Sequence, residues 1–449
     1  MEDQKPNKEI WQSKPSAVRI LEDNLGAFLI LTILLIGTTV TILPIVEPLS
    51  SRRTVIQSES QYILVGGQNG TWFKRGQAPR LYRILLSNLS VKRLTPVSSQ
   101  GTVWGGGWNG SQWLISGWGT NPGPHGSNPY IYLNDGLNQV VAGTLSQYDS
   151  ESSWHGGDIF AASYGRNHWL LSGLGSDALP PSSKQPFNHM SLASFDGYHF
   201  RDLSTMVPNQ KDAILYANAW NGQYWLVGGG FLQFRVLFAF DGVKVTDLTS
   251  QLADQVRGSG SVQSIGWNGK YWLIGGINFL AQFDGKHFFD LTPKLTRVLG
   301  GRFTVNAMAW DGHEWMLSGG SPVAQLHPSK AWITIYSSFG FSDLTRHLPA
   351  YLSNESSSIL TIAYADPSWI LGGYSDKHAG LLLSYQGGTF KDLSDLAKDM
   401  SYVIWVGAGT LTNRQQDFTN FTFTSLATAV PCVTSPDYLR IISKQVSRL

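Results

Sequence analysis

The feature that most constrains the fold is a phrase that recurs along the chain. In its full form an apolar strand ends in Trp-Asn-Gly or Trp-Asp-Gly, and two residues later an aromatic residue starts an aliphatic run that ends in glycine. Four full copies begin at Trp108, Trp220, Trp267 and Trp310, and three looser copies occupy residues 62–67, 169–173 and 369–373. Seven copies of one unit indicate a repeat protein.

A second phrase alternates with the first. Alternating apolar residues lead to an Asp-Gly turn and an aromatic residue, and then to Asp-Leu-Thr or Asp-Leu-Ser. The final aspartates of the five clearest copies are Asp202, Asp247, Asp290, Asp343 and Asp392. Weaker copies lie at residues 86–95 and 132–145, which again makes seven. The units follow one another at about 43 to 56 residues, the spacing of propeller blades.

The turn chemistry shows what one unit folds into. Asn-Gly and Asp-Gly between alternating apolar runs are strong hairpin signals, and both turn residues are expected to take positive φ. Two hairpins in succession form a four-stranded antiparallel sheet. Such a sheet cannot bury both faces alone, whereas seven arranged radially bury them between neighbours. The sequence therefore predicts an all-β fold, a seven-bladed β-propeller with four-stranded blades.

The repeat resembles the kelch repeat. The resemblance is clearest where the aliphatic run ending in Gly275 and Gly276 is followed by Phe283-Asp284-Gly285 and another aromatic residue, Phe288. It covers roughly residues 54–410 and concerns structural positions, and the arginine usual in the kelch consensus is missing. The resemblance implies a propeller fold and frequent use as a binding platform, and it names no partner.

Ring closure and the tail are predicted from the ends of the repeat region. Residues 403–406 are expected to close the ring beside the strand at 62–67, with residues 54–58 as the competing segment. From Ser435 and Pro436 onward, a cap residue, a proline and apolar residues at helical spacing predict a short amphipathic helix.

An uncharged apolar stretch near the start of the chain predicts a membrane span. Residues 25–46 would form a helix of about 33 Å, close to the thickness of a bilayer core. Four basic residues precede the span (Lys5, Lys8, Lys14 and Arg19) and two follow it, which favours a cytoplasmic N-terminus. The predicted organisation is a cytoplasmic segment 1–24, a transmembrane helix 25–46, a linker 47–60, a propeller 61–410 and a tail 411–449. The propeller would be extracytoplasmic, held at the cell membrane by this single-pass signal-anchor.

Candidate binding residues are taken from the loops between the tight turns. Both turns of a blade should lie on one rim, so every variable loop should lie on the other, and such loops often form the binding face of repeat proteins. The candidates are the aromatic and histidine residues of these loops: Trp118, His125, Trp154, His155, His189, His327 and His378.

Several function classes are disfavoured. The net charge of +2 is too small for a nucleic-acid binder, and Cys432 is the only cysteine, so neither an intrachain disulfide nor a Cys-x-x-Cys site is possible. Nucleophile-elbow, phosphate-loop and dinucleotide motifs are absent from the sequence. The repeated aspartates of the second phrase are predicted to make turn hydrogen bonds and no catalysis. We expect no cofactor and no metal.

These observations predict a non-catalytic, membrane-tethered propeller that acts as a protein-binding accessory or scaffold subunit of a membrane protein complex. The expected partners are other membrane proteins, with a small-molecule ligand left open. The alternative is an exported glycan-binding or carbohydrate-active propeller, in which aromatic side chains such as Trp118, Trp154 and Tyr164 would form sugar platforms.

Overall fold

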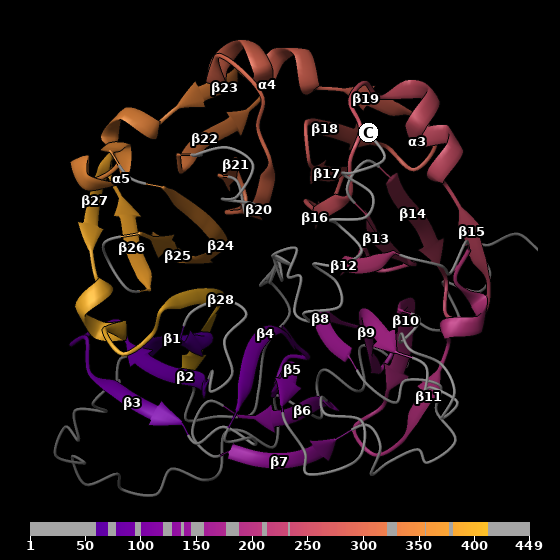
Figure 1. Ribbon diagram of the computed structural model, residues 1–449, viewed down its shortest axis with the longest axis horizontal. Coiled ribbons are helices and arrows are strands. Elements are labelled where there is room, and N and C mark those ends of the chain that lie inside the picture. The colour runs from indigo at the N-terminus through magenta and orange to yellow at the C-terminus, as the bar shows by residue number, and fades with distance from the viewer. Residues whose placement is uncertain are drawn as a thin grey trace, which may run out of the picture. The chain divides into compact units, whose positions relative to one another are not determined.

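The computed structural model describes residues 60–70, 78–94, 100–119, 128–135, 139–144, 157–176, 188–208, 213–231, 234–320, 330–354, 356–376 and 380–411. These residues belong to the second of two units of the chain, Glu59–Leu449. They form seven four-stranded antiparallel sheets arranged around a central axis (Figure 1). The predicted seven-bladed all-β propeller is therefore confirmed.

Two predicted helices lie outside the described residues: the membrane span at 25–46 and the amphipathic helix after Ser435. Among the helices that the structure does describe, none combines the length and the apolarity needed to cross a bilayer.

The blades are numbered in chain order, and their strands are given from the axis outward. Blade 1 consists of β28 (Tyr402–Leu411), β1 (Ser60–Asn69), β2 (Ala78–Leu85) and β3 (Val91–Leu94). Blade 2 consists of β4 (Gly101–Trp108), β5 (Trp113–Gly119), β6 (Asn128–Asn134) and β7 (Gln139–Thr144). Blade 3 consists of β8 (Gly157–Gly165), β9 (His168–Ser176), β10 (Asn188–Phe195) and β11 (Phe200–Asp202). Blade 4 consists of β12 (Ile214–Trp220), β13 (Trp225–Phe231), β14 (Phe234–Phe240) and β15 (Val245–Asp247).

The remaining three blades have the same plan. Blade 5 consists of β16 (Val262–Trp267), β17 (Trp272–Gly276), β18 (Phe279–Phe283) and β19 (Phe288–Asp290). Blade 6 consists of β20 (Val305–Trp310), β21 (Trp315–Gly319), β22 (Trp332–Ser337) and β23 (Gly340–Asp343). Blade 7 consists of β24 (Ser357–Ala365), β25 (Ser368–Ser375), β26 (Leu381–Gln386) and β27 (Thr389–Asp392).

Short helices follow the outermost strands. They are η1 (Ser204–Met206), α3 (Thr249–Gln255), α4 (Thr292–Leu299), η2 (Thr345–His347), α5 (Ala350–Asn354) and η3 (Ser394–Ala397). Helix α4 has a proline in its first turn and ends at Gly300, which takes φ of 75°, the usual end of a helix. Helix α3 bridges two blades: its Gln251 side chain donates to the Lys286 carbonyl of the next blade at 2.6 Å.

The Trp-Asn-Gly turns join the first two strands of a blade. In blade 4, Trp220 and Trp225 face each other across the turn with ring centroids 4.2 Å apart. The Asn221 side chain accepts the backbone N–H groups of Gln223 and Tyr224, each at 2.8 Å. Only the glycine takes positive φ, 96° at Gly222. The expectation that both turn residues take positive φ is wrong, because the asparagine acts instead through its side-chain oxygen.

The Asp-Leu-Thr/Ser phrase is a structural motif, as predicted. In blade 4, Asp247 accepts the backbone N–H of Thr249 at 2.9 Å. The Thr249 hydroxyl in turn accepts the N–H of Leu237 at 3.1 Å and donates to the Leu237 carbonyl at 3.2 Å. The same aspartate bond is made by Asp202, Asp290, Asp343 and Asp392. In blades 3 to 7 the phrase thus fixes the end of the outer strand, and in blade 4 the Thr249 bonds tie it to the third strand.

Each innermost strand contains a β-bulge of one residue. In blade 4, Leu215 pairs with Gly229 and Ala217 pairs with Gly228, so Tyr216 is the extra residue. Because of the bulge, the carbonyl of Ile214 lies against Gly229, and a β-carbon there would come closer than 3.0 Å to that oxygen. The same close approach occurs at the equivalent glycines of the other blades: Gly67, Gly117, Gly173, Gly276, Gly319 and Gly373. This packing is why the aliphatic run of every repeat ends in glycine.

The bulged residues form a ring around the axis: Ile404, Trp104, Phe160, Tyr216, Gln263, Asn306 and Leu360, in blade order. Five of the seven are apolar or aromatic and belong to one buried cluster. In this cluster Phe160 packs against Trp104 and Tyr216, with ring centroids 5.3 and 5.7 Å apart. Because these five residues come from the innermost strands of five blades, their packed apolar side chains lie at the axis.

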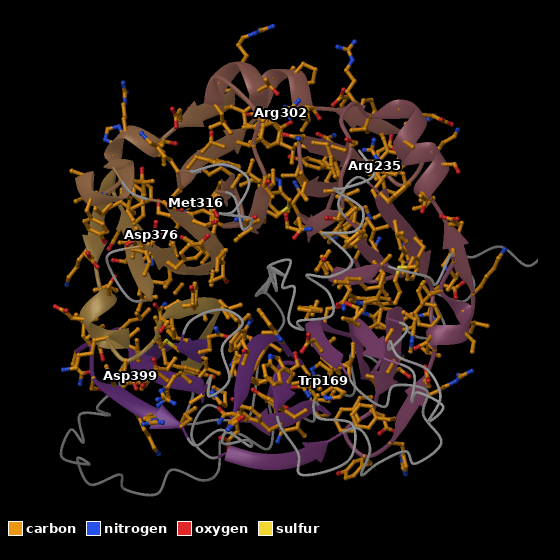
Figure 2. The ribbon with its side chains drawn as sticks, viewed as in Figure 1. Trp169, Arg235, Arg302, Met316, Asp376 and Asp399 are labelled. Carbon is orange, nitrogen blue, oxygen red and sulfur yellow. The ribbon has the colours of Figure 1, made fainter. Side chains whose placement is uncertain are left out.

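The ring is closed by strands from the two ends of the propeller. β28 pairs with β1, with Val406 opposite Val65 and Trp405 opposite Gly66. The prediction that residues 403–406 lie beside the strand at 62–67 is confirmed, and the competing segment 54–58 lies outside the described residues. Asp399 (Figure 2), just before β28, reinforces the closure. Its carboxylate accepts Arg80 Nε at 3.0 Å and the Tyr82 hydroxyl.

Buried side chains and hydrogen bonds join neighbouring blades. Asn218 of blade 4 donates to the Ala161 carbonyl at 3.3 Å and to the Ser172 hydroxyl at 2.7 Å, both in blade 3. Between the ribbons the space is filled by side chains such as Met316 of blade 6, which is fully buried (Figure 2). Contacts between the facing surfaces of neighbouring sheets therefore stabilise the ring, as expected for blades arranged radially.

Candidate functional site

The two rims of the propeller differ. The turns that join the first strand to the second, and the third to the fourth, lie on one rim, which we call the turn rim. In blades 5 and 6 these turns occupy residues 268–271, 284–287, 311–314 and 337–340. The connections between second and third strands lie on the opposite rim, which we call the loop rim. The connections from one blade to the next enter the following blade on that rim too, but their helices, such as α3 and α4, also reach residues of the turn rim. The predicted binding residues belong to the loop rim.

Two of the predicted site residues fall within the described part of the chain. Trp118 lies near the end of β5, half-buried, and packs against the axial cluster. His189 lies at the start of β10, opposite Gly175 of β9. Both are at the loop-rim end of their strands. Five predicted residues lie outside the described residues: His125, Trp154, His155, His327 and His378. A binding role for these seven residues stays a prediction.

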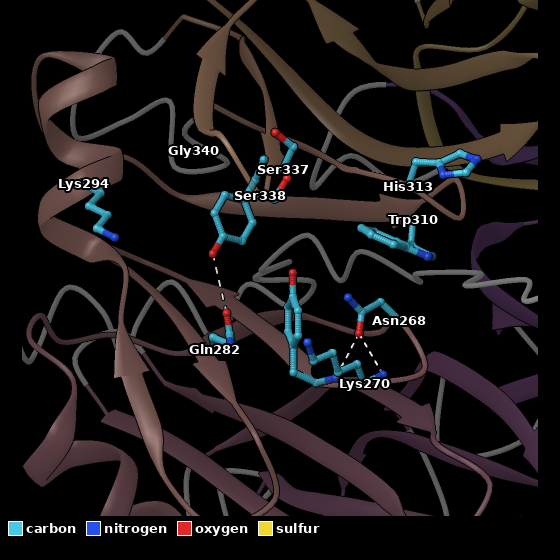
Figure 3. Close-up of a pocket in the computed structure, with 11 residues that line it drawn as sticks. Asn268, Lys270, Gln282, Lys294, Trp310, His313, Ser337, Ser338 and Gly340 are labelled. Carbon is cyan, nitrogen blue, oxygen red and sulfur yellow. Dashed lines mark hydrogen bonds between the residues drawn. The ribbon is translucent and has the colours of Figure 1, made fainter.

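A pocket of about 480 Å³ opens on the turn rim between blades 5 and 6 (Figure 3). The turns after β16, β20 and β22 contribute to its wall, together with β18 and helix α4. Lys294 of α4 lies on one side, and Trp310 and His313 lie on the opposite side. We call this the 5/6 pocket. Its volume lies in the range of small-molecule sites, roughly 300 to 1,000 Å³.

Three aromatic side chains line the 5/6 pocket: Tyr271, Trp310 and Tyr336. Each is held by the repeat architecture. Tyr271 follows the Asn268 turn, whose side-chain oxygen accepts its N–H at 2.9 Å. Tyr336 stacks on Phe341 at 4.5 Å, and its hydroxyl lies 3.5 Å from Gln282 Oε1. The pocket therefore has rigid, flat apolar walls that carry polar edges.

The partial burial of the two tyrosine rings changes the pKa of their hydroxyl groups. Burial raises the pKa of Tyr271 and of Tyr336 above the ordinary tyrosine value. Both hydroxyls therefore stay neutral at physiological pH; the Tyr336 hydroxyl donates to Gln282 Oε1, and the Tyr271 hydroxyl can donate to a ligand.

The charged groups at the 5/6 pocket are cationic. Lys270 and Lys294 are exposed at its mouth, and none of the eleven described residues that line it carries a carboxylate, although Asp311 and Glu314 lie in the adjoining turn. Lys270 is positioned by the Asn268 turn, since the Asn268 side chain accepts its backbone N–H at 3.0 Å. Two ammonium groups without a neighbouring carboxylate in the lining favour a ligand with negative charge.

A second pocket, of about 360 Å³, lies on the same rim between blades 3 and 4. We call it the 3/4 pocket. Arg166 and Arg201 supply positive charge, while Phe200 and Phe240 supply aromatic surface. Its one carboxylate, Asp196, accepts the backbone N–H groups of His199 and Tyr198, which lowers the pKa of Asp196 to about 2. The two pockets thus share a composition of aromatic walls and cationic mouth.

These pocket residues are not among the predicted site residues, because they lie inside the repeated phrase, whose pattern indicates structure. The sequence does contain an indication of these residues, namely the turn positions at which the copies of the phrase differ. The two residues between the turn glycine and the tryptophan are Ser-Gln, Gln-Tyr, Lys-Tyr and His-Glu in the four full copies. Positions that vary within a regular turn are those that the fold leaves open to function. Among the described residues no group of three or more metal-ligating side chains occurs.

Comparisons with known proteins give a likeness of fold. No family model and no curated protein matches the sequence. Among solved structures, the acylaminoacyl peptidase of Pyrococcus horikoshii matches 75% of this chain and 51% of its own, with 9% identity and a TM-score of 0.47. The propeller domain of the Trilobed protease from Pyrococcus furiosus matches 75% of this chain and 93% of its own, with 10% identity and a TM-score of 0.46. A puromycin-hydrolyzing peptidase of Mycobacterium tuberculosis matches 69% and 50%, with 14% identity and a TM-score of 0.38.

The expectation of a non-catalytic accessory or scaffold subunit is corrected: the solved structures that this chain resembles in fold are peptidases, so the fold gives no assignment as a scaffold. The error arose from treating absent catalytic motifs as evidence of a scaffold, although a propeller repeat encodes a fold and no activity. The match covers about half the length of the acylaminoacyl peptidase chain. At this level of identity it concerns the fold.

Proposed function

We propose that this chain is a binding protein that takes, in the 5/6 pocket, an anionic group joined to a flat apolar group. The observation that carries the proposal is the combination of three aromatic walls, Tyr271, Trp310 and Tyr336, with two ammonium groups, Lys270 and Lys294. Aromatic faces take up flat apolar surface by stacking. Ammonium groups and neutral phenol hydroxyls both donate hydrogen bonds to an anion.

The test is titration calorimetry of the full-length protein with benzylphosphonate, and with benzyl alcohol as the neutral analogue. We expect benzylphosphonate to bind and benzyl alcohol to bind at least about tenfold more weakly, since it offers no charge to the lysines. The variant in which Lys270 and Lys294 are both changed to alanine should lose about 30-fold or more in affinity for benzylphosphonate. Trp310→Ala should lose about tenfold through the missing stacking surface.

The matched control is Lys391→Ala, which removes an exposed lysine from β27 of blade 7, outside the 5/6 pocket. It should bind benzylphosphonate like the unaltered protein. All the lysines changed are exposed, so the melting temperatures should agree. If benzylphosphonate does not bind, or binds equally well to the double-lysine variant, the proposal is wrong.

We also propose that residues 25–46 span a membrane once, with the propeller outside the cytoplasm, and that the repeats are kelch-like. The uncharged span and the basic residues before it support the first part, and the aliphatic-Gly-Gly and Asp-Gly phrases support the second. Alkaline carbonate extraction of membranes that contain the full chain should leave it in the pellet. A variant without residues 25–46 should appear in the supernatant. Release of the full chain by carbonate would contradict the anchor.

A further inference from the structure

Three large apolar side chains stand out from the turn rim. Tyr198 is 79% exposed, Val243 78% and Phe339 fully exposed. Each occupies the tip of the turn between the third and fourth strands of its blade, in blades 3, 4 and 6. The turn itself does not require an apolar residue, because Lys286 occupies the equivalent place in blade 5. Single exposed apolar side chains are common on protein surfaces, but these three occupy the same turn position and therefore project from the same rim.

The turns hold these residues in place. Asp196 accepts the backbone N–H of Tyr198, and Asp241 accepts that of Val243, each at 2.8 Å. The Ser337 hydroxyl accepts the N–H of Phe339 at 3.2 Å. The exposed tips therefore sit on turns whose backbone is fixed.

The tips border the two cationic pockets. Phe339 lies between Ser338 and Gly340, which both line the 5/6 pocket. Tyr198 and Val243 are next in sequence to His199 and Gly242, which line the 3/4 pocket. Each pocket therefore combines positive charge at its mouth with an apolar side chain that projects beside it. The turns of this rim also carry carboxylates, such as Asp241, Asp284 and Asp311, so the match to an anionic bilayer is confined to the two pockets, where apolar tips lie beside cationic groups.

The chain also enters and leaves the propeller on this rim. Ser60, the first residue of β1, pairs with Leu411, the last residue of β28. Gln61 accepts the N–H of Leu86, which begins the turn between β2 and β3. The linker 47–60 separates this point from the proposed span at 25–46, and fully extended it reaches at most about 50 Å. The rim with the apolar tips is thus the one joined to the linker.

We propose that the turn rim docks on the surface of a phospholipid bilayer, with Tyr198, Val243 and Phe339 entering the interfacial region. The 5/6 and 3/4 pockets then receive the phosphate groups of anionic lipids, a part that rests on the proposed function of the 5/6 pocket. Lys270 and Lys294, and Arg166 and Arg201, are the groups that meet these phosphates.

The experiment places a fluorescent label at single cysteines of the full-length protein in liposomes. The native Cys432 is first changed to serine, and bimane is then attached to Phe339→Cys or to Phe234→Cys. Phe234 is the matched control: it is 74% exposed and lies at the start of β14, on the loop rim. Quenching is measured with headgroup-nitroxide lipids from the membrane side and with iodide from the water side. Liposomes are made of phosphatidylcholine alone or with phosphatidylglycerol.

We expect the label at 339 to be quenched by nitroxide lipids about threefold more than the label at 234, and to be protected from iodide to a similar degree. The difference should grow when phosphatidylglycerol is present, and should shrink toward its phosphatidylcholine value when Lys270 and Lys294 are changed to alanine. Equal quenching at 339 and 234 by both reagents overturns the docking proposal.

The two experiments together distinguish bilayer docking from anion binding in the 5/6 pocket. Benzylphosphonate binding together with equal quenching at 339 and 234 would leave the 5/6 pocket as a site for a soluble ligand and would refute bilayer docking. Protection at 339 without benzylphosphonate binding would support docking through the apolar tips and would refute the headgroup site.

Discussion

Gly229→Ala is expected to lower the free energy of unfolding by at least about 3 kcal/mol, which is large against a total of roughly 5 to 15 kcal/mol. The added β-carbon would come closer than 3.0 Å to the carbonyl oxygen of Ile214. That oxygen belongs to the backbone just before the bulge at Tyr216, so it cannot rotate away as a side chain would. Relief requires either separating β12 from β13 or removing the bulge, and both disturb the axial cluster.

The measurement is the denaturant midpoint of the full-length variant, and complete loss of folded protein counts as the same outcome. The matched control is Gly301→Ala, because a β-carbon at Gly301 meets nothing within 4 Å. Its change should stay within about 0.5 kcal/mol. Equal midpoints for the two variants would show that the contact between Gly229 and Ile214 is not limiting for stability.

Ending the chain after Ser401 is expected to abolish cooperative unfolding of the propeller. This change removes β28, the innermost strand of blade 1, together with Trp405 and Val406, which are fully buried. Trp405 packs edge-on against Trp113 of blade 2, with centroids 5.5 Å apart, so its loss opens the contact between blades 1 and 2. β1 would then present an unpaired edge, which promotes association with other chains.

A chain that ends after Leu411 is the control, since it retains β28 entire. The two chains are compared by thermal unfolding and by gel filtration. The shorter chain should aggregate or unfold without a sharp transition, and the longer one should unfold cooperatively. Similar transitions in both would mean that the ring does not depend on closure by β28.

Much of the fold follows from local rules that each repeat obeys. Trp220 and Trp225 flank an Asn-Gly turn, and their spacing alone implies that they pair across a hairpin. The segment at 403–406 was identified as the closing strand because it resembles a first strand that no second strand follows. Such inferences succeed because both the turn and the pairing are decided within a few residues.

The site was harder to predict because it depends on contacts between repeats. Lys270 and Lys294 belong to blade 5, whereas Trp310 and Tyr336 belong to blade 6. Whether these side chains meet in one pocket depends on the angle between the sheets of blades 5 and 6. The sequence of a single repeat does not specify that angle. The bulges were missed for a related reason: an extra residue such as Tyr216 does not interrupt the alternation strongly enough to be recognised. The glycine that accommodates each bulge was visible in the sequence, although its purpose was not.

The pairing of Ser60 with Leu411 makes the beginning and the end of the propeller neighbours in space. A covalent connection between them would need only a short turn, and the ring could then be opened at a connection elsewhere without changing any blade. Circular permutants of this domain are thus topologically simple. The same geometry makes the propeller a transferable cassette, because a host protein needs only two adjacent points on its backbone to carry the whole ring.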